Sequence, residues 1–147
     1  MSEGKDRIKV LFVCTGNSCR SQIAEGWARH LKSDAVEAYS AGVSPGTLNT
    51  TAVSVMAEAG VDISTQRPKH VDELLGIDFD YVVTICDNAK EKCPVFPGRT
   101  RHIHRPFEDP SFMSGTEEQI MAAFRELRDQ VKAFVENIPE NLQEQGY

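Results

Sequence analysis

The sequence lacks long apolar runs and an excess of positive charge. No apolar run among its 147 residues approaches the ~18 residues that a membrane-spanning helix requires. The formal net charge is −6, and a surface of that sign repels nucleic acid and anionic lipid. We therefore expect no nucleic-acid partner and no membrane partner, and any anion must be bound by a local positive pocket.

Targeting signals, internal repeats and linkers are also missing. The N-terminal stretch is polar and leads directly into an apolar run of strand type, unlike a secretory signal peptide. We expect a cytoplasmic location and one domain over residues 1–138, followed by a frayed polar tail over residues 139–147. Because no surplus apolar stripe is evident, we expect a monomer.

Cysteine is scarce, with four in the chain, at positions 14, 19, 86 and 93. In a chain of this class they favour catalytic, redox or metal-binding roles over a permanent disulfide framework. Cys86 and Cys93 lack the close Cys-x2-Cys spacing of structural zinc sites. His102 and His104 share one face of a predicted strand and are explained as polar residues of its edge. We expect no bound metal.

Four short apolar runs indicate buried strands, and the segments between them have helical periodicity. We expect strands at residues 9–14, 36–41, 80–86 and 100–104, and helices at residues 18–32, 49–59 and 116–137. Strands that alternate with helices predict an α/β fold with a parallel sheet and right-handed crossovers. Such sheets bind ligands at the carboxyl ends of their strands, where Cys14 and Cys86 end the two most apolar runs.

The most informative stretch is "VCTGNSCRS", residues 13–21, which ends the first predicted strand. Five residues separate the thiol of Cys14 from the guanidinium of Arg20, so a tight loop can turn its backbone N–H groups toward a tetrahedral anion. Gly16 supplies conformational freedom, and Asn17 tolerates left-handed geometry. The N-terminus of the following helix points at the same place, and Arg20 matches two oxygens of phosphate or arsenate.

The same surroundings suit a cysteine nucleophile. Positive groups around Cys14 favour its thiolate form at neutral pH, and Ser21 is placed to donate a hydrogen bond to that sulfur. The alternative is a strand-to-helix turn in which Cys14 is only a small buried apolar residue. Because the pattern follows a strand, contains Gly-Asn and opens a helix, we interpret Cys14 as an activated nucleophile beneath a bound oxyanion.

The stretch "VCTGNSCRSQIAEG" resembles the signature of the low-molecular-weight protein tyrosine phosphatases, and more closely that of the thioredoxin-coupled arsenate reductases with the same fold. The likeness extends from residue 9 to about residue 134 and includes "YSAG", "VVTICD", "CP" and "EDP". It implies a single-domain, flavodoxin-like, four-stranded parallel sheet with helices on both faces. The oxyanion-binding loop that it implies comprises Thr15, Gly16, Asn17, Ser18, Cys19 and Ser21, with Cys14 as nucleophile and Arg20 as the oxyanion-binding arginine.

The resemblance also implies a general acid in the stretch "RPFEDPSF". Asp109 matches the family's proton donor, and Glu108 is the neighbouring candidate. An aspartate before proline is ordinarily a turn former, because the residue before proline favours extended geometry. The chemistry needs a proton donor for the oxygen that leaves when the thiolate attacks, and we therefore favour Asp109.

The segment "CDNAKEKCP" separates a reductase from a phosphatase, since a reductase needs thiols that end as a disulfide. The resemblance implies that Cys14 attacks arsenate while Asp109 protonates the leaving water. Cys86 then attacks Cys14 and releases arsenite, and Cys93 attacks Cys86 to close the Cys86–Cys93 disulfide. Reduced thioredoxin supplies the electrons without a bound cofactor, and Cys19 has no redox role.

Geometry adds one consequence to that implied order. If "DNAKEK" is helical, Cys86 and Cys93 lie roughly 10.5 Å apart along the helix axis, whereas a disulfide needs Cα atoms within ~7 Å. We therefore expect residues 87–92 to unwind on oxidation, which would also expose the new disulfide to a reductant.

One departure from the family concerns a potassium ion that some relatives hold near the loop. Its ligands match Asn17, Glu25 and Ser40, but the position of the remaining acidic ligand is Lys69 here. An ammonium group there would occupy the cation site or repel the ion. We expect no strong dependence of turnover on potassium.

Two other functions remain open at this level. A low-molecular-weight protein tyrosine phosphatase would use the same loop, although its usual flanking aromatic residues are represented here by Phe112 alone, three residues after Asp109. A sensor that binds arsenite or a metal through its thiols would need neither Asp109 nor the loop. In the reductase, phosphate and sulfate would compete with arsenate, and residual phosphatase activity is expected.

Overall fold

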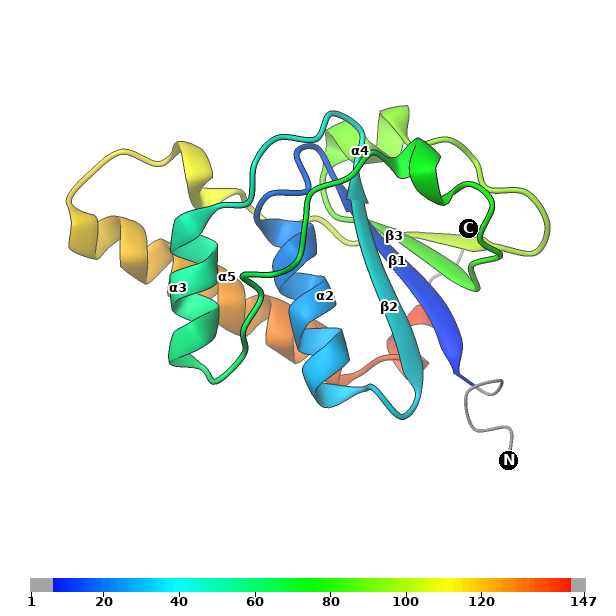
Figure 1. Ribbon diagram of the computed structural model, residues 1–147, viewed down its shortest axis with the longest axis horizontal. Coiled ribbons are helices and arrows are strands. Elements are labelled where there is room, and N and C mark those ends of the chain that lie inside the picture. Colours follow the sequence, from blue (N-terminus) through cyan, green and yellow to red (C-terminus); the bar gives the residue numbers. More distant parts are fainter. Residues whose placement is uncertain (1–6, 144–147) are drawn as a thin grey trace.

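The computed structural model describes residues 7–143 (Figure 1). Its strands are β1 (Ile8–Cys14), β2 (Val36–Gly42), β3 (Tyr81–Thr84) and β4 (Arg101–His104). They form one parallel sheet in the order β2-β1-β3-β4. This confirms the predicted α/β class and the four-stranded parallel sheet.

Helices cover both faces of the sheet. The α-helices are α2 (Arg20–Leu31), α3 (Thr50–Glu58), α4 (Asp87–Lys92), α5 (Glu117–Glu136) and α6 (Glu140–Gln143), and the 3-10 helices are η1 (Val71–Leu74) and η2 (Pro110–Phe112). One hydrophobic cluster joins the sheet to α2, α3, α5 and α6. A second cluster joins the opposite face to η1 and α4, which lie together beside the strands in Figure 1.

The apolar run of β1 reflects its position inside the sheet. Alternate side chains of a strand point to opposite faces, and here Val10 and Phe12 enter the first cluster while Leu11 and Val13 enter the second. All four side chains are fully buried. This part of β1 is covered on both faces and has no solvent-facing position, which explains why it is apolar, whereas Lys9 lies at the partly exposed start of the strand.

The longest helix, α5, is set by its cap and its apolar face. Thr116 caps the N-terminus by accepting from the backbone N–H of Gln119, whose side chain accepts in turn from the Thr116 N–H. Phe124, Leu127 and Val131 are among the buried residues of its inner face. The predicted range of 116–137 therefore contains the helix together with its two capping residues.

The C-terminal segment differs from the expected frayed polar tail over residues 139–147. Residues 140–143 form α6, and Leu142 is fully buried in the first hydrophobic cluster. Leu142 packs this turn against the core, and Asn141 Nδ2 donates to the carbonyl of Phe134 at 2.9 Å. The polar composition of the segment concealed these contacts. Residues 144–147 lie outside the described residues. Within residues 7–143, every helix is too short or too polar to cross a bilayer.

Candidate active site

Two of the cysteines lie at the carboxyl edge of the sheet, in neighbouring strand-to-helix connections. β1 ends at Cys14, and β3 ends at Thr84, two residues before Cys86. The predicted strand to residue 86 is too long, because Cys86 instead caps α4. The hydroxyl oxygen of Thr15 lies 3.3 Å from the Cys86 Sγ. The structure thus joins the residue that follows Cys14 to the thiol of Cys86.

The segment of residues 43–49 holds the loop of residues 14–20 through hydrogen bonds to the carbonyl oxygens of the loop. The carbonyls of Cys14, Thr15, Gly16 and Ser18 accept hydrogen bonds of 2.8 to 3.2 Å from backbone N–H groups of residues 43–49. In a trans peptide the N–H points away from the carbonyl of the preceding residue. The loop N–H groups are consequently turned to the inner side, which is the arrangement of an anion-binding nest.

Gly42, the last residue of β2, lets the neighbouring chain approach this loop. A Cβ atom at position 42 would lie 2.6 Å from the Thr15 carbonyl oxygen and 2.9 Å from the Asn17 backbone nitrogen. Both contacts are to backbone and cannot be relieved by a side-chain rotation. The end of β2 therefore requires glycine if the loop is to keep its shape.

Cys14 is 2% exposed, and hydrogen-bond donors surround its sulfur. The Asn17 backbone N–H donates to Sγ at 3.2 Å, and the Ser21 Oγ lies 2.8 Å from it. Asn17 Nδ2 donates to the same Ser21 oxygen at 2.8 Å, which leaves the hydroxyl hydrogen of Ser21 free to point at the sulfur. Asn17 has a φ of 49°, in the left-handed region that asparagine tolerates. Two hydrogen-bond donors therefore converge on the sulfur of Cys14.

Arg20 and Asp109 form an ion pair at the loop. The Arg20 side chain is mostly buried, and its Nη2 donates to Asp109 Oδ2 at 3.3 Å while Nη1 donates to the Phe107 carbonyl at 3.2 Å. The other carboxylate oxygen of Asp109 accepts from the Ser111 N–H at 2.9 Å. Glu108 is exposed. The structure therefore brings Asp109 to the loop as expected, and Arg20 holds it there.

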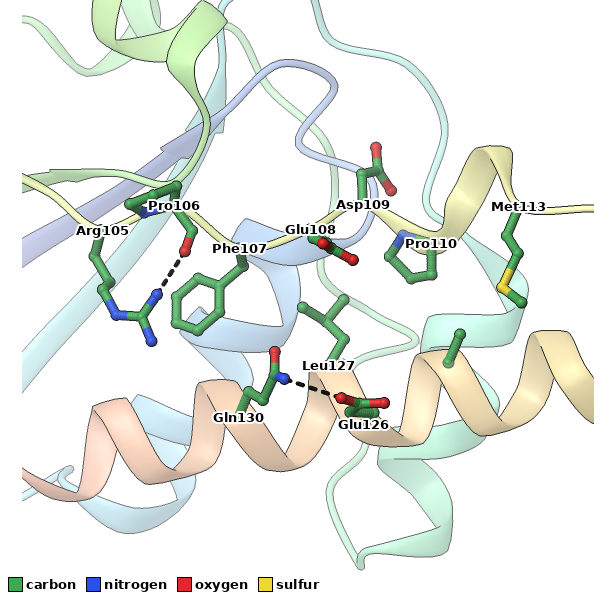
Figure 2. A pocket seen from close by; sticks show the side chains of 11 residues that line it. Arg105, Pro106, Phe107, Glu108, Asp109, Pro110, Met113, Glu126, Leu127 and Gln130 are labelled. Carbon is green, nitrogen blue, oxygen red and sulfur yellow. Dashed lines mark hydrogen bonds between the residues drawn. The ribbon is translucent and has the colours of Figure 1, made fainter.

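A cavity of about 610 Å³ flanks this region between the loop that carries Asp109 and helix α5 (Figure 2). Phe107, Leu127 and Met113 contribute its apolar lining, and none of the cysteines lines it. The Asp109 carboxylate points away from α5 in Figure 2. Arg20 does not line the cavity either, so the cavity lies to one side of the loop of residues 14–20.

The sulfur of Cys86 is held by a helix N-terminus and a hydroxyl group. Cys86 Sγ accepts from the Ala89 backbone N–H at 3.3 Å, as the N-cap of α4. Asn88 Nδ2 donates to the Thr15 hydroxyl oxygen at 3.0 Å, so the Thr15 hydroxyl hydrogen is free to donate to Cys86. These contacts hold the Cys86 sulfur beside the loop of Cys14.

Cys93 lies at the opposite end of α4, as its C-cap. Its side chain is half-buried and packs against the hydrophobic cluster that contains Phe96. Burial, with a smaller contribution from the charge of Asp72, raises the pKa of the Cys93 thiol to about 11. Cys93 is therefore protonated at neutral pH in this conformation.

Cys19, inside the loop, is 2% exposed. Burial raises its pKa strongly, the charges of Asp109 and Cys14 add to the rise, and Arg20 opposes it. Cys19 is thus a protonated, buried thiol. Its lack of a redox role stays a prediction.

The Lys69 ammonium lies beside the residues that match the family's potassium ligands. Its Nζ donates to the carbonyl of Ser40 at 2.8 Å, and the Ser40 hydroxyl donates to the buried Glu25 at 2.5 Å. Burial lowers the pKa of Lys69, and the charge of Glu25 opposes that shift. Independence from potassium stays a prediction. Within residues 7–143, no group of three or more His, Cys, Asp or Glu side chains is arranged to hold a metal ion.

Two supporting contacts were missed by the sequence analysis. His104 was interpreted only as a strand-edge residue, but its Nε2 lies 2.9 Å from the carboxylate of Asp87 at the start of α4. Gln22 is fully buried in α2 and donates to the Asn17 carbonyl at 2.9 Å. Gln22 follows Arg20 and Ser21 in the first turn of α2, and no pattern in the sequence distinguished it from an exposed polar residue.

Comparison with known proteins gives concordant matches. The model of the low molecular weight phosphotyrosine protein phosphatase family matches residues 9–146. The chain is 44% identical over 122 residues to the arsenate reductase of Bacillus subtilis (strain 168), which covers 83% of this chain and 88% of that protein.

Solved structures agree with these sequence matches. An arsenate reductase in the phosphate binding state superposes with a TM-score of 0.74 at 33% identity, covering 91% of this chain and 98% of that chain. A thioredoxin-dependent arsenate reductase from Corynebacterium glutamicum has a TM-score of 0.70 at 26% identity, covering 97% of this chain and 67% of that chain.

Proposed function

Because the chain belongs to the low molecular weight phosphotyrosine protein phosphatase family, we propose that it is an arsenate reductase regenerated by thioredoxin. Arsenate reductases are among its relatives at 44% identity, and one structural neighbour is thioredoxin-dependent. The observation that carries the proposal is the contact of Cys86 with Thr15, which places a second thiol beside the loop of Cys14. A phosphatase requires the loop alone and has no use for that thiol.

The proposed reaction begins with arsenate in the loop of residues 14–20. The inward N–H groups and Arg20 bind its oxygens. The Cys14 thiolate attacks arsenic and forms a sulfur–arsenic bond, and one arsenic–oxygen bond breaks as Asp109 protonates the departing oxygen, which leaves as water. Phosphate and sulfate have similar shape and charge and are expected to compete.

Electron transfer occurs in the second step. The Cys86 thiolate attacks the sulfur of Cys14, a sulfur–sulfur bond forms, and the sulfur–arsenic bond breaks with its electron pair left on arsenic. Arsenic is thereby reduced and leaves as arsenite, while the two thiols are oxidised to a disulfide. Cys93 then attacks Cys86, Cys14 leaves as a thiolate, and the Cys86–Cys93 disulfide is reduced by the two thiols of thioredoxin.

Cys86 and Cys93 differ in their surroundings, and the difference supports this order of reaction. The Cys86 sulfur contacts the Ala89 N–H and the Thr15 hydroxyl, so it already lies beside the loop of Cys14. Cys93 has a pKa of about 11 because it is buried, so little of it is thiolate at neutral pH until burial is relieved. Opening of α4 would lower that pKa toward its ordinary value and shorten the distance between the two sulfurs. Cys93 is therefore expected to react last.

Oxidation is expected to speed amide hydrogen exchange over residues 87–92. These residues form α4 in the structure described here, and a disulfide between its two capping cysteines is incompatible with a continuous helix. The measurement compares the fully reduced protein with the protein after one equivalent of arsenate, using α3 (Thr50–Glu58) as the internal reference. Unchanged exchange over residues 87–92 in protein that carries the disulfide would contradict the unwinding.

Asp109→Asn is expected to lower kcat by about 10²-fold or more, because the departing oxygen loses its proton donor. Glu108→Gln is the matched control, since it removes the adjacent carboxylate, which is exposed. Its kcat should equal that of the parent protein. Steady-state kinetics with arsenate measures both variants, and a larger loss in Glu108→Gln than in Asp109→Asn would transfer the acid role to Glu108.

The proposed function is tested by coupling the protein to thioredoxin, thioredoxin reductase and NADPH. Arsenate should cause continuous NADPH oxidation and release of arsenite. Hydrolysis of an aryl phosphate should be detectable but slow, since the loop also fits phosphate. Rapid aryl phosphate hydrolysis without any arsenate-dependent NADPH oxidation would establish the phosphatase instead.

A relay of free thiols also bears on location and assembly. All four cysteines are unpaired in the structure, and a thiol relay needs a compartment in which thioredoxin keeps such residues reduced. We propose a cytoplasmic location on this ground. The residues of the relay all come from one chain, and we propose a monomer.

A further inference from the structure

Gln22 is a polar side chain in the first turn of α2, where Arg20, Ser21 and Ile23 are also buried. Its side chain has no exposed surface. Its Nε2 donates to the carbonyl oxygen of Asn17 at 2.9 Å, and its Oε1 accepts from the Nε2 of Gln66 at 2.8 Å. Because a carbonyl oxygen only accepts, the nitrogen of the Gln22 amide must face Asn17.

An apolar residue would fill this position at lower cost. A buried amide loses its hydrogen bonds with water, and that loss is compensated only when both ends find partners in the protein. Gln66 supplies the partner for the oxygen and also donates to the Gln22 backbone carbonyl at 3.1 Å. Nitrogen and oxygen of the Gln22 amide are thus both satisfied, and its place against the Asn17 carbonyl is defined.

The hydrogen bond from Gln22 to the Asn17 carbonyl fixes the orientation of the peptide group between Asn17 and Ser18. Asn17 has left-handed backbone geometry, which is strained for a residue other than glycine and needs support from its surroundings. With the Asn17 carbonyl bound to Gln22 on the outer side, the Ser18 N–H of the same peptide is turned to the inner side. Rotation of this peptide would replace an N–H donor with a carbonyl oxygen at the anion.

The segment that follows α3 holds Asn17 at two places. Gln66 acts through Gln22 on the carbonyl, and the Lys69 backbone N–H donates to Asn17 Oδ1 at 3.0 Å. The second contact orients the Asn17 side chain, whose Nδ2 donates to Ser21. The backbone of Asn17 therefore depends on Gln22 and its side chain on Lys69.

We propose that Gln22, supported by Gln66, is a positioning residue for oxyanion binding that keeps the Ser18 N–H directed at the anion. The inference rests on the proposed use of residues 14–20 as an oxyanion site. Gln22 lies outside that loop, and its proposed role is to strengthen the binding of the anion by the loop. This role is the same whether the loop serves to reduce arsenate or to hydrolyse a phosphate ester.

The test uses Gln22→Met, which has similar length and no hydrogen-bonding amide. Isothermal titration of the full, reduced chain with inorganic phosphate should show a dissociation constant raised about tenfold, the usual effect of one lost buried hydrogen bond. KM for arsenate should rise by the same factor while kcat stays near that of the parent, because the anion is held equally in the bound state and the transition state. Gln66→Met should raise the phosphate dissociation constant and the KM for arsenate as well, by a smaller factor.

Ile23→Val is the matched control for general loss of stability. Ile23 is fully buried on the same helix, and its truncation destabilises the core while its side chain takes no part in the contacts of Asn17. Its phosphate affinity should equal that of the parent. The proposal is overturned if Gln22→Met loses stability but keeps the parent dissociation constant, or if its loss is in kcat alone. If Gln22→Met does not fold, an unchanged affinity in Gln66→Met overturns it.

Failure of the proposed function would have a different signature. A parent protein that binds phosphate but does not reduce arsenate would refute the reductase and leave the comparison of Gln22→Met with Ile23→Val fully interpretable.

Discussion

Cys14→Ser is expected to lose both arsenate reduction and aryl phosphate hydrolysis by about three orders of magnitude or more, as removal of a catalytic nucleophile commonly does. Cys14 is the sulfur toward which Asn17 and Ser21 direct hydrogen bonds. A serine hydroxyl in its place remains protonated at neutral pH and is a poor nucleophile. Steady-state rates of both reactions measure the effect.

Phosphate binding provides the control for the Cys14→Ser variant. The N–H groups of the loop and the guanidinium of Arg20 are unchanged by the substitution, so the variant should still bind inorganic phosphate. Retained binding with lost activity would locate the defect in the chemical step. Substantial arsenate reduction by Cys14→Ser would show that another thiol performs the first attack and would refute the proposed order of the three cysteines.

Cys93→Ser is expected to stop after one round of reduction, and Cys86→Ser to release no arsenite at all. In Cys93→Ser the Cys86 thiolate still attacks Cys14, so one equivalent of arsenite forms and a Cys14–Cys86 disulfide accumulates. In Cys86→Ser the arsenic stays on Cys14 because no neighbouring thiol displaces it. Continuous turnover with thioredoxin should be lost in both variants.

Two measurements distinguish a specific loss of the thiol relay from misfolding of the Cys86→Ser and Cys93→Ser variants. Aryl phosphate hydrolysis by the reduced enzyme should persist in both variants, since it needs only the loop and Asp109. Mass spectrometry of the parent protein after one equivalent of arsenate should find residues 86 and 93 linked, and of Cys93→Ser should find residues 14 and 86 linked. Normal turnover by Cys93→Ser would refute the last step, and an unlinked pair in the parent protein would refute the relay.

Local patterns in the sequence predicted the elements that depend on local contacts. The continuous apolar run of β1 indicated a strand covered on both faces, and it has a hydrophobic cluster on each side. The amphipathic pattern of α5 predicted that helix to within its two capping residues. The prediction of a frayed tail is wrong for residues 140–143, which the buried Leu142 and a hydrogen bond of Asn141 hold against the core. One buried apolar residue is too little to form a pattern in the sequence.

The sequence by itself determined the α/β class, and it predicted an anion-binding loop at residues 14–20 because the thiol, Gly16, Asn17 and Arg20 lie within one short stretch. Only the tertiary structure decided which distant groups meet that stretch. Thr15 contacts Cys86, 71 positions away, and Arg20 contacts Asp109, 89 positions away. The physical reason is that all four strands are parallel, so that their carboxyl ends share one edge of the sheet. The loop after β1 meets there the connection after β3, which carries Cys86, and the connection after β4, which carries Asp109.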